Sequence, residues 1–180
     1  MRANPGRLSI GTAGAGSFNH LAMALFHQMT GTKVTFIHYK GGAPLMTDLL
    51  AGRIQGSMNS IQLVSGPVAS GKLKAIGIST AARSPSMPQV RPIGEQGVQG
   101  YDISQWIGFV APGATPAPIV NRLSEEFRMH LQSKEGLEFH EKVRRYPVGN
   151  APAEFRNVLK EEIARWRILL KDANLELDGE

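Results

Sequence analysis

The sequence contains no cysteine, so neither a disulfide framework nor a thiolate metal site is available to it. Long apolar stretches are also missing, because no window reaches the ~20 apolar residues that a membrane-spanning helix requires. The first residues, MRANPGRLSIG, lack the apolar region of a secretory signal peptide. These absences exclude a disulfide-stapled domain and a membrane-embedded domain for the residues given.

Aromatic residues and clustered positive charges are scarce. Aromatic residues make up 7% of the chain, and Arg144-Arg145 is the longest run of basic residues, although the net charge is +5. A platform for single-stranded nucleic acid needs aromatic side chains interleaved with basic ones. We therefore expect no nucleic-acid partner, and the positive balance favours an anionic ligand.

Residues 7–79 predict strands that alternate with helices. With 180 residues and 42% hydrophobic content, the chain can form one domain with a core, or one domain and part of another. Strand–helix alternation is typical of a mostly parallel α/β sheet. The first helix has Ser17 as its predicted N-cap and Gly31 as its predicted stop. The predicted strands are 7–10, 33–39, 54–58 and 73–79, and the predicted helices are 17–30, 44–51 and 62–70.

The rest of the chain has a different pattern. Residues 80–105 are rich in proline and glycine and predict a connecting segment. Residues 106–111, WIGFVA, predict a strand that is buried on both faces, and residues 146–148 predict a short strand. Helices are predicted from Thr115-Pro116 onward and over residues 152–173. Two strands cannot cover two long amphipathic helices, so residues 106–180 predict only part of a second domain.

The loop GTAGAGSFN after the first strand leads into a helix. Gly11 and Gly16 have the separation of a P-loop, but Ser17 stands where the phosphate-binding lysine must be, so an ATP site is not expected. The glycine spacing of a dinucleotide site also fails. Two interpretations stay open. One is an anion site at the helix N-terminus with the Ser17 hydroxyl; the other is a tight turn that needs glycine only for its backbone conformation.

Ser17 and His20 are candidates for a nucleophile and a general base, since residues i and i+3 can meet on a first helical turn. No carboxylate nearby would orient the imidazole. The histidines of the sequence form no metal-binding pattern, and no cofactor is expected. Binding is therefore favoured over reaction, and the alternative is a small-molecule enzyme that uses the loop of residues 11–20.

Two further loops are predicted at the same edge of the sheet. Residues 39–43, YKGGA, follow the second strand, and Asn59 follows the third strand. Ligands of open α/β sheets bind at the carboxyl edge of the strands. The three loops together predict a polar receptor for a small, oxygen-rich molecule.

The motifs ANPGRLSIGTAGAGSFNHLAMALFHQMTG, HYKGGAPLMTDLLAGRI, GKLKAIGIST and WIGFVAPGATP follow one another in this order. With them the sequence resembles the substrate-binding receptors of tripartite tricarboxylate transporters, also called Bug receptors. The resemblance implies a periplasmic binding protein of type II-like α/β fold, not an enzyme, in which two lobes close on the solute. Its implied partners are a small organic carboxylate and the membrane permease subunits of the transporter.

The resemblance also implies a division of the chain. Residues 7–79 would form one complete parallel-sheet lobe (the second lobe of the family), residues 80–105 the connecting segment, and residues 106–180 the C-terminal part of the first lobe. The family's N-terminal part, with its signal peptide, has no counterpart here, and ANPG resembles the end of a preceding helix. We therefore expect a truncated form of a longer protein. The alternative is a natural fragment that pairs with another chain, or associates with itself, through residues 106–111.

By position in the family, two loops would hold the ligand carboxylate. Backbone N–H groups and the Ser17 hydroxyl would come from the first loop, and residues 39–43 would supply a second set. Asn59 stands where the family commonly has an aspartate, and its neutral amide predicts a carboxylate ligand without an ammonium group. The expected ligand-binding residues are Thr12, Ala13, Gly14, Gly16, Ser17, Asn19, His20, Tyr39, Lys40, Gly41, Gly42, Ala43 and Asn59.

Overall fold

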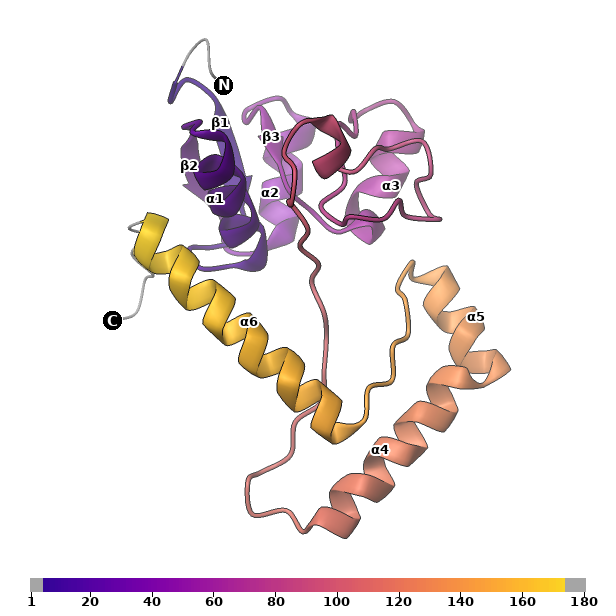
Figure 1. Cartoon of the computed structure of the whole chain (residues 1–180). Coiled ribbons are helices and arrows are strands. Elements are labelled where there is room, and N and C mark those ends of the chain that lie inside the picture. Colours follow the sequence, from indigo (N-terminus) through magenta and orange to yellow (C-terminus); the bar gives the residue numbers. More distant parts are fainter. Residues whose placement is uncertain (1–4, 174–180) are drawn as a thin grey trace. The chain divides into compact units, whose positions relative to one another are not determined.

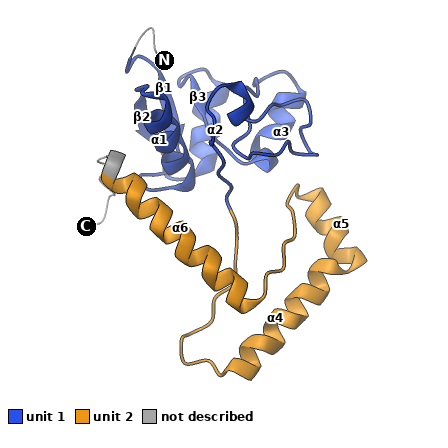
Figure 2. Cartoon of the chain, in the orientation of Figure 1, with its two compact units in different colours: residues 1–105, 172–180 blue, residues 106–171 orange. Residues whose placement is uncertain are grey.

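The computed structural model describes residues 5–173, which fall into two compact units. One unit contains the chain up to Gln105, and the other contains Trp106–Lys171 (Figure 2). The helices and strands are labelled in Figure 1. They are β1 (Ser9–Thr12), α1 (Phe18–Thr30), β2 (Thr35–His38), α2 (Gly42–Leu50), β3 (Gly56–Ser57), α3 (Ile61–Ala69), a 3-10 helix (Gly94–Gln96), α4 (Ala117–Gln132), α5 (Lys134–Lys142) and α6 (Pro152–Ala173).

The sheet of the first unit has three parallel strands in the order β2-β1-β3. Central strand β1 pairs Ile10 with Phe36 on one side and with Gly56 on the other. The α/β class with a parallel sheet is therefore confirmed. The crossover helices α1 and α2 give each pair of parallel strands the connection that it requires.

Helix α1 ends at Thr30, as predicted. Gly31 follows it with φ +61°, the left-handed conformation in which a helix commonly stops and which glycine adopts without strain. Ser17 is at the N-cap position, but its side chain makes no capping bond to the helix. Its hydroxyl bonds within the preceding loop, so the capping role predicted for that side chain is wrong.

The predicted strand at residues 73–79 is wrong. Ile78 alone pairs there, in an isolated parallel bridge to Pro92. Its N–H donates to the Arg91 oxygen at 3.0 Å, and its oxygen accepts the Ile93 N–H at 2.9 Å. The connecting segment therefore takes the hydrogen bonds that a neighbouring strand would have made.

Residues 80–105 pack on the first unit. Tyr101 is 1% exposed, and its hydroxyl donates to the Ala22 carbonyl oxygen at 2.8 Å. Ile103 is also buried, and its N–H donates to the Ser79 oxygen at 2.9 Å. The contacts of Tyr101 and Ile103 make residues 80–105 part of the core that supports the sheet.

A second group of buried apolar side chains, which includes Leu45 and Ile54, lies between α2 and the start of β3.

The second unit contains α4, α5 and α6. The strands predicted at residues 106–111 and 146–148 are wrong, because no strand occurs in the described part of this unit. Helix α6 has its predicted bounds. Helix α5 was not predicted, although Ser133 caps it by accepting the Gly136 N–H at 3.0 Å. The first half of the ANPG motif and the last residues of the segment 106–180 lie outside the described residues.

Within the described residues, no helix is long and apolar enough to cross a membrane.

Candidate functional site

Two loops meet where the parallel strands end. The loop from β1 to α1 and the loop from β2 to α2 are joined by two backbone hydrogen bonds. The Tyr39 N–H donates to the Thr12 oxygen at 2.9 Å, and the Gly41 N–H donates to the Ala13 oxygen at 3.2 Å. The start of α2 also adjoins α3, since a Cβ on Gly42 would lie 3.4 Å from Leu63. The structure thus brings the first two predicted loops together at the carboxyl edge of the sheet.

Polar side chains of the first loop hold its backbone. The Asn19 Oδ1 accepts the Ala13 N–H at 3.2 Å and lies 2.6 Å from the Ser17 Oγ. The same hydroxyl is 2.6 Å from the Gly14 carbonyl oxygen. Gly14 itself has φ +139°, a backbone conformation that side chains rarely allow. Sequence-predicted residues Asn19 and Ser17 therefore shape this loop through their own bonds.

His20 lies beneath the loop. It is 3% exposed, and its Nδ1 accepts the Gly16 N–H at 3.1 Å. Because Nδ1 accepts, the neutral ring carries its proton on Nε2. The ring packs edge-on against Phe36 and His38, with centroids 4.7 and 4.8 Å away. Buried Thr12 belongs to the same cluster, since its Oγ1 is 2.6 Å from the His38 Nδ1.

Several backbone donors around the loops remain unpaired within the described chain. The N–H groups of Gly14 and Ala15 make no hydrogen bond there, and neither do those of Gly42 and Ala43 at the start of α2. No side chain caps α1, α2 or α3. The first N–H groups of a helix have no partner inside the helix, and they carry its positive dipole end. This edge of the sheet therefore presents unpaired donors in a positive field.

Asn59 and Lys40 add side chains to this edge. Asn59 follows β3 by two residues, and its buried Nδ2 has no hydrogen-bond partner among the described residues. Buried amide donors without a partner are uncommon in folded proteins. Lys40 has an exposed side chain in the second loop. The site thus combines a neutral amide with one cation.

The Tyr39 ring is tied to α2. Its hydroxyl donates to the Asp48 Oδ2 at 2.9 Å, and the Arg53 Nη1 donates to the Asp48 Oδ1 at 2.7 Å. Desolvation, and then the neighbouring Asp48 carboxylate, raise the pKa of Tyr39. Hydrogen bonds from Arg53 and Tyr39 lower the pKa of Asp48. The sequence analysis did not predict the interaction of Tyr39, Asp48 and Arg53, because nothing in the segment DLLAGR indicates that Asp48 contacts Tyr39.

Ser17 and His20 do not form a catalytic pair. The Ser17 hydroxyl bonds to oxygen atoms of Gly14 and Asn19, and the His20 Nδ1 is taken by the Gly16 N–H. A serine nucleophile needs its base within hydrogen-bonding reach. Among residues 5–173, no group of histidine and carboxylate side chains could hold a metal ion. The arrangement offers donors to a ligand and places no base beside the Ser17 hydroxyl among the residues it bonds to.

Solved structures with the same backbone define the class of protein. Rpa4515 of R. palustris, solved with adipate, has a TM-score of 0.86 and 31% identity, over 97% of this chain and 58% of its own. The periplasmic binding protein BugD has a TM-score of 0.82 and 27% identity, over 97% and 59%. MatC from Rhodopseudomonas palustris, solved with bound malate, has a TM-score of 0.78 and 25% identity, over 92% and 57%. The fold is that of a periplasmic solute-binding protein.

The family follows from the sequence comparison. Residues 1–175 match the family model of the tripartite tricarboxylate transporter family receptor, and the chain belongs to that family. Protein BugT of Bordetella pertussis is 30% identical over 98% of this chain and 54% of its own length. A UPF0065 protein of Agrobacterium vitis is 30% identical over 96% and 51%. The chain therefore spans about half the length of these curated relatives. Its family consists of receptors, not enzymes.

Proposed function

We propose that this chain forms one side of a periplasmic receptor that captures a small carboxylate for the permease of a tripartite tricarboxylate transporter. Residues 7–79 are the lobe that supplies this side, and residues from 106 onward belong to the opposite lobe. The family supports the receptor role, and the adipate and malate bound to Rpa4515 and MatC support a dicarboxylate ligand.

The observation that carries the proposal is the set of unpaired donors at the sheet edge. The N–H groups of Gly14 and Ala15, with those of Gly42 and Ala43, can donate to a carboxylate. Bonds from N–H groups to an ionised oxygen are roughly twice as strong as neutral ones. Helix N-termini add a favourable field for an anion. Lys40 adds a positive charge nearby that attracts an acid to this edge.

The internal bonds of the loop prepare it for binding. Asn19 holds the Ala13 N–H and His20 holds the Gly16 N–H, so these two donors are occupied by the protein. The intervening pair of N–H groups, on Gly14 and Ala15, is left for a ligand. A loop already ordered in its binding conformation avoids part of the ordering cost of association. In this proposal Asn19 and His20 position the donors and do not touch the ligand.

Asn59 sets the charge preference. Its amide is neutral, and the unpaired Nδ2 is a donor that suits a carboxylate oxygen. An aspartate at this position would repel an acid and attract an ammonium group. We therefore propose that the ligand is a carboxylate without an amino group. Adipate and 2-aminoadipate form a matched pair that separates the two preferences.

The experiment is an NMR titration of the ¹⁵N-labelled chain with adipate. Because one side of a cleft makes only part of the contacts, we expect a dissociation constant of about 1 mM, or about −4.1 kcal/mol. The amide signals of Gly14, Ala15 and Gly42 should move in a saturable way. Those of Gly52 and Gly71, which lie in turns away from the three loops, should not. Unmoved signals of Gly14 and Ala15, or tighter binding of 2-aminoadipate, would contradict the proposal.

A further inference from the structure

The second loop, residues 39–43, contains a pair of glycines directly at the start of α2. Gly41 has φ +102°, a conformation that other residues rarely adopt, and Gly42 follows it. Glycine loses more conformational freedom on folding than any other residue. The N–H groups of Gly42 and Ala43, which have no partner in the described chain, come directly after this turn. Their positions therefore depend on contacts that hold the chain on both sides of the glycine pair.

Tyr39 holds the chain before the glycine pair. Its N–H donates to the Thr12 oxygen at 2.9 Å, and its ring packs on the buried apolar group between α2 and the start of β3. A Cβ on Gly11 would lie 3.3 Å from the Tyr39 Cε2, so the ring also adjoins β1. The ring is thus held by β1 and by the apolar core, and its hydroxyl reaches α2 at Asp48.

Asp48 holds the chain after the glycine pair. The Tyr39 hydroxyl donates to the Asp48 Oδ2 at 2.9 Å, between residues that are nine positions apart. This bond joins the residue before the second loop's glycines to the last turn of the helix that follows them. Fixing the two ends of a short segment restricts the conformations of the residues between them. The bond therefore limits the freedom of Gly41 and Gly42.

Arg53 holds Asp48 from the segment after α2. Its Nη1 donates to the Asp48 Oδ1 at 2.7 Å, and its backbone N–H donates to the Asp48 carbonyl oxygen at 2.9 Å. The two carboxylate oxygens of Asp48 are thus bonded to two different residues. Arg53 therefore keeps the carboxylate turned so that its other oxygen meets the Tyr39 hydroxyl.

Stability alone does not account for Asp48. It lies in the last turn of α2, where the negative end of the helix dipole disfavours a carboxylate. The side chain of Arg53 is 68% exposed and that of Asp48 is 26% exposed, and an ion pair with so exposed a partner contributes little to stability. The order that this network gives to the loop is the better explanation of its geometry.

We propose that Tyr39, Asp48 and Arg53 position the second loop for the ligand carboxylate, an inference that rests on the proposed function. The three residues act through the backbone and do not touch the ligand. Asp48 holds the Tyr39 hydroxyl, which is consequently not a ligand donor, although Tyr39 is a predicted ligand-binding residue. The competing explanation is that the charge of Arg53 attracts the anion directly, and it predicts a different result below.

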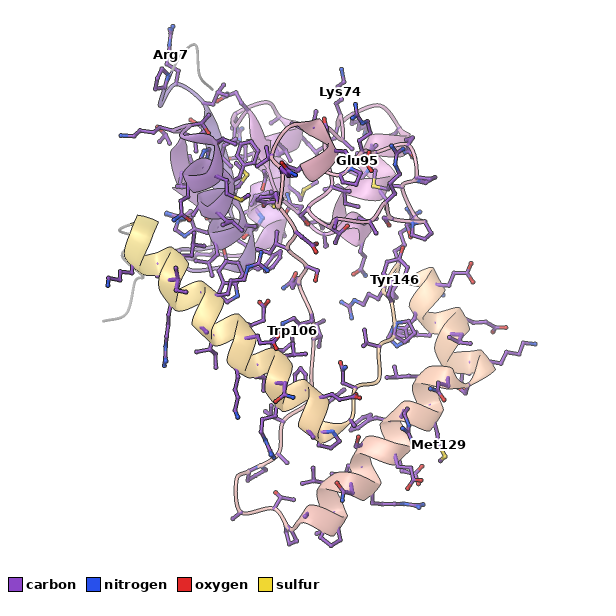
Figure 3. The ribbon with its side chains drawn as sticks, in the orientation of Figure 1. Arg7, Lys74, Glu95, Trp106, Met129 and Tyr146 are labelled. Atoms are coloured by element: carbon purple, nitrogen blue, oxygen red, sulfur yellow. The ribbon has the colours of Figure 1, made fainter. Side chains whose placement is uncertain are left out.

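The first measurement needs no ligand. Tyr39→Phe keeps the ring and removes the hydroxyl. In the ligand-free ¹⁵N-labelled chain, the Gly41 N–H, which donates to the Ala13 oxygen at 3.2 Å, should exchange at least about tenfold faster in this variant than in the wild type. Glu95→Gln is the matched control and should leave this exchange unchanged. Glu95, labelled in Figure 3, also accepts from an arginine at 2.9 Å, in the first unit but outside the three loops.

The second measurement is the adipate titration followed by NMR. Tyr39→Phe should bind adipate about tenfold more weakly, because the donors of the loop are no longer held in place. Arg53→Met keeps the apolar stem; it should weaken binding in the wild type and have no further effect in the Tyr39→Phe background. If the charge of Arg53 acted directly on the anion, Arg53→Met would weaken binding equally in both backgrounds. Glu95→Gln should bind as the wild type does.

The outcomes separate this inference from the proposed function. If adipate leaves the Gly14 and Ala15 signals of the wild type unmoved, the proposed function is contradicted, and the ligand-binding part of this inference with it. If the wild type binds adipate and Tyr39→Phe binds it equally well, the positioning role is overturned and the proposed function stands. Unchanged exchange at Gly41, or equal effects of Arg53→Met in both backgrounds, would also overturn the positioning role.

Discussion

The Nδ1 atom of His20 accepts a hydrogen bond from the backbone N–H of Gly16 at 3.1 Å. The imidazole is 3% exposed and packs against Phe36 and His38 from below the loop. Its role is therefore to fix the backbone of a glycine-rich turn, which has few side-chain contacts of its own. The loop keeps its shape through a buried ring four residues further along the chain.

Replacing His20 with phenylalanine should loosen this loop. The ring packing is retained, but the Gly16 N–H loses its acceptor, which costs about 1–3 kcal/mol of folding free energy. The Gly16 amide should exchange at least about tenfold faster, as measured by NMR. His130→Phe is the control, because His130 has an exposed side chain on α4. Unchanged exchange at Gly16 would show that His20 does not hold the loop.

Gly11→Ala should destabilise the first unit. A Cβ at this position would lie 2.5 Å from the Ile54 Cδ1 and 3.2 Å from the Leu45 Cγ, both in buried side chains. Overpacking of this kind costs about 1–3 kcal/mol, so the urea midpoint measured by circular dichroism should fall. Gly113→Ala is the matched control, because nothing lies within 4 Å of its Cβ position. Equal midpoints for the two variants would refute the packing argument.

The stability of the protein should depend on pH through His27. Burial lowers the pKa of His27 from its ordinary value of 6.5. The unfolded chain then binds a proton near pH 6.5, where the folded chain does not. The contribution of neutral His27 to the stability of the folded chain is complete above pH 6.5. It is lost as the pH falls below 6.5 toward the lowered pKa of His27 in the folded state.

Urea unfolding at several pH values tests this dependence. Between about pH 7 and 5, the wild type should lose more stability than His27→Phe does, since the variant has no titrating group there. A slope that survives in His27→Phe would assign the effect to other groups.

Asn59→Asp should change the ligand preference of the proposed site. The new carboxylate would repel adipate, and we expect about tenfold weaker binding, or about 1.4 kcal/mol. It would also favour the ammonium group of 2-aminoadipate. Calorimetric titration of the wild type and of Asn59→Asp with each acid measures this change in ligand preference. Asn59→Gln serves as the neutral control, and unaltered selectivity in Asn59→Asp would remove Asn59 from the site.

Several helix ends in both units could be predicted because their signals are local. The glycine at the end of α1, the proline at the start of α6 and the alternation of apolar segments act within a few residues. The carboxyl-edge rule also located the loops at Ala13 and Gly41, which the structure joins by a hydrogen bond.

The partners of individual side chains could not be predicted in the same way. Asn19 and His20 bond to the loop, and Tyr39 bonds to Asp48, only because of the conformation that each loop adopts. Asn19, His20 and Tyr39 are predicted ligand-binding residues, and a sequence pattern does not show which other groups of the chain each of them bonds to.

The sequence by itself determined the order β1-α1-β2-α2-β3-α3 of the first unit and the polar chemistry of its loops, because turn residues and apolar periodicity act locally. Tertiary structure alone decided which extended segments became strands. Ile78 bonds to the chain around Pro92, and residues 106–111 have helices on both faces but no strand beside them in the described chain. A strand forms only when a second strand supplies its hydrogen bonds. That second strand is distant in the sequence, so a local pattern does not reveal it.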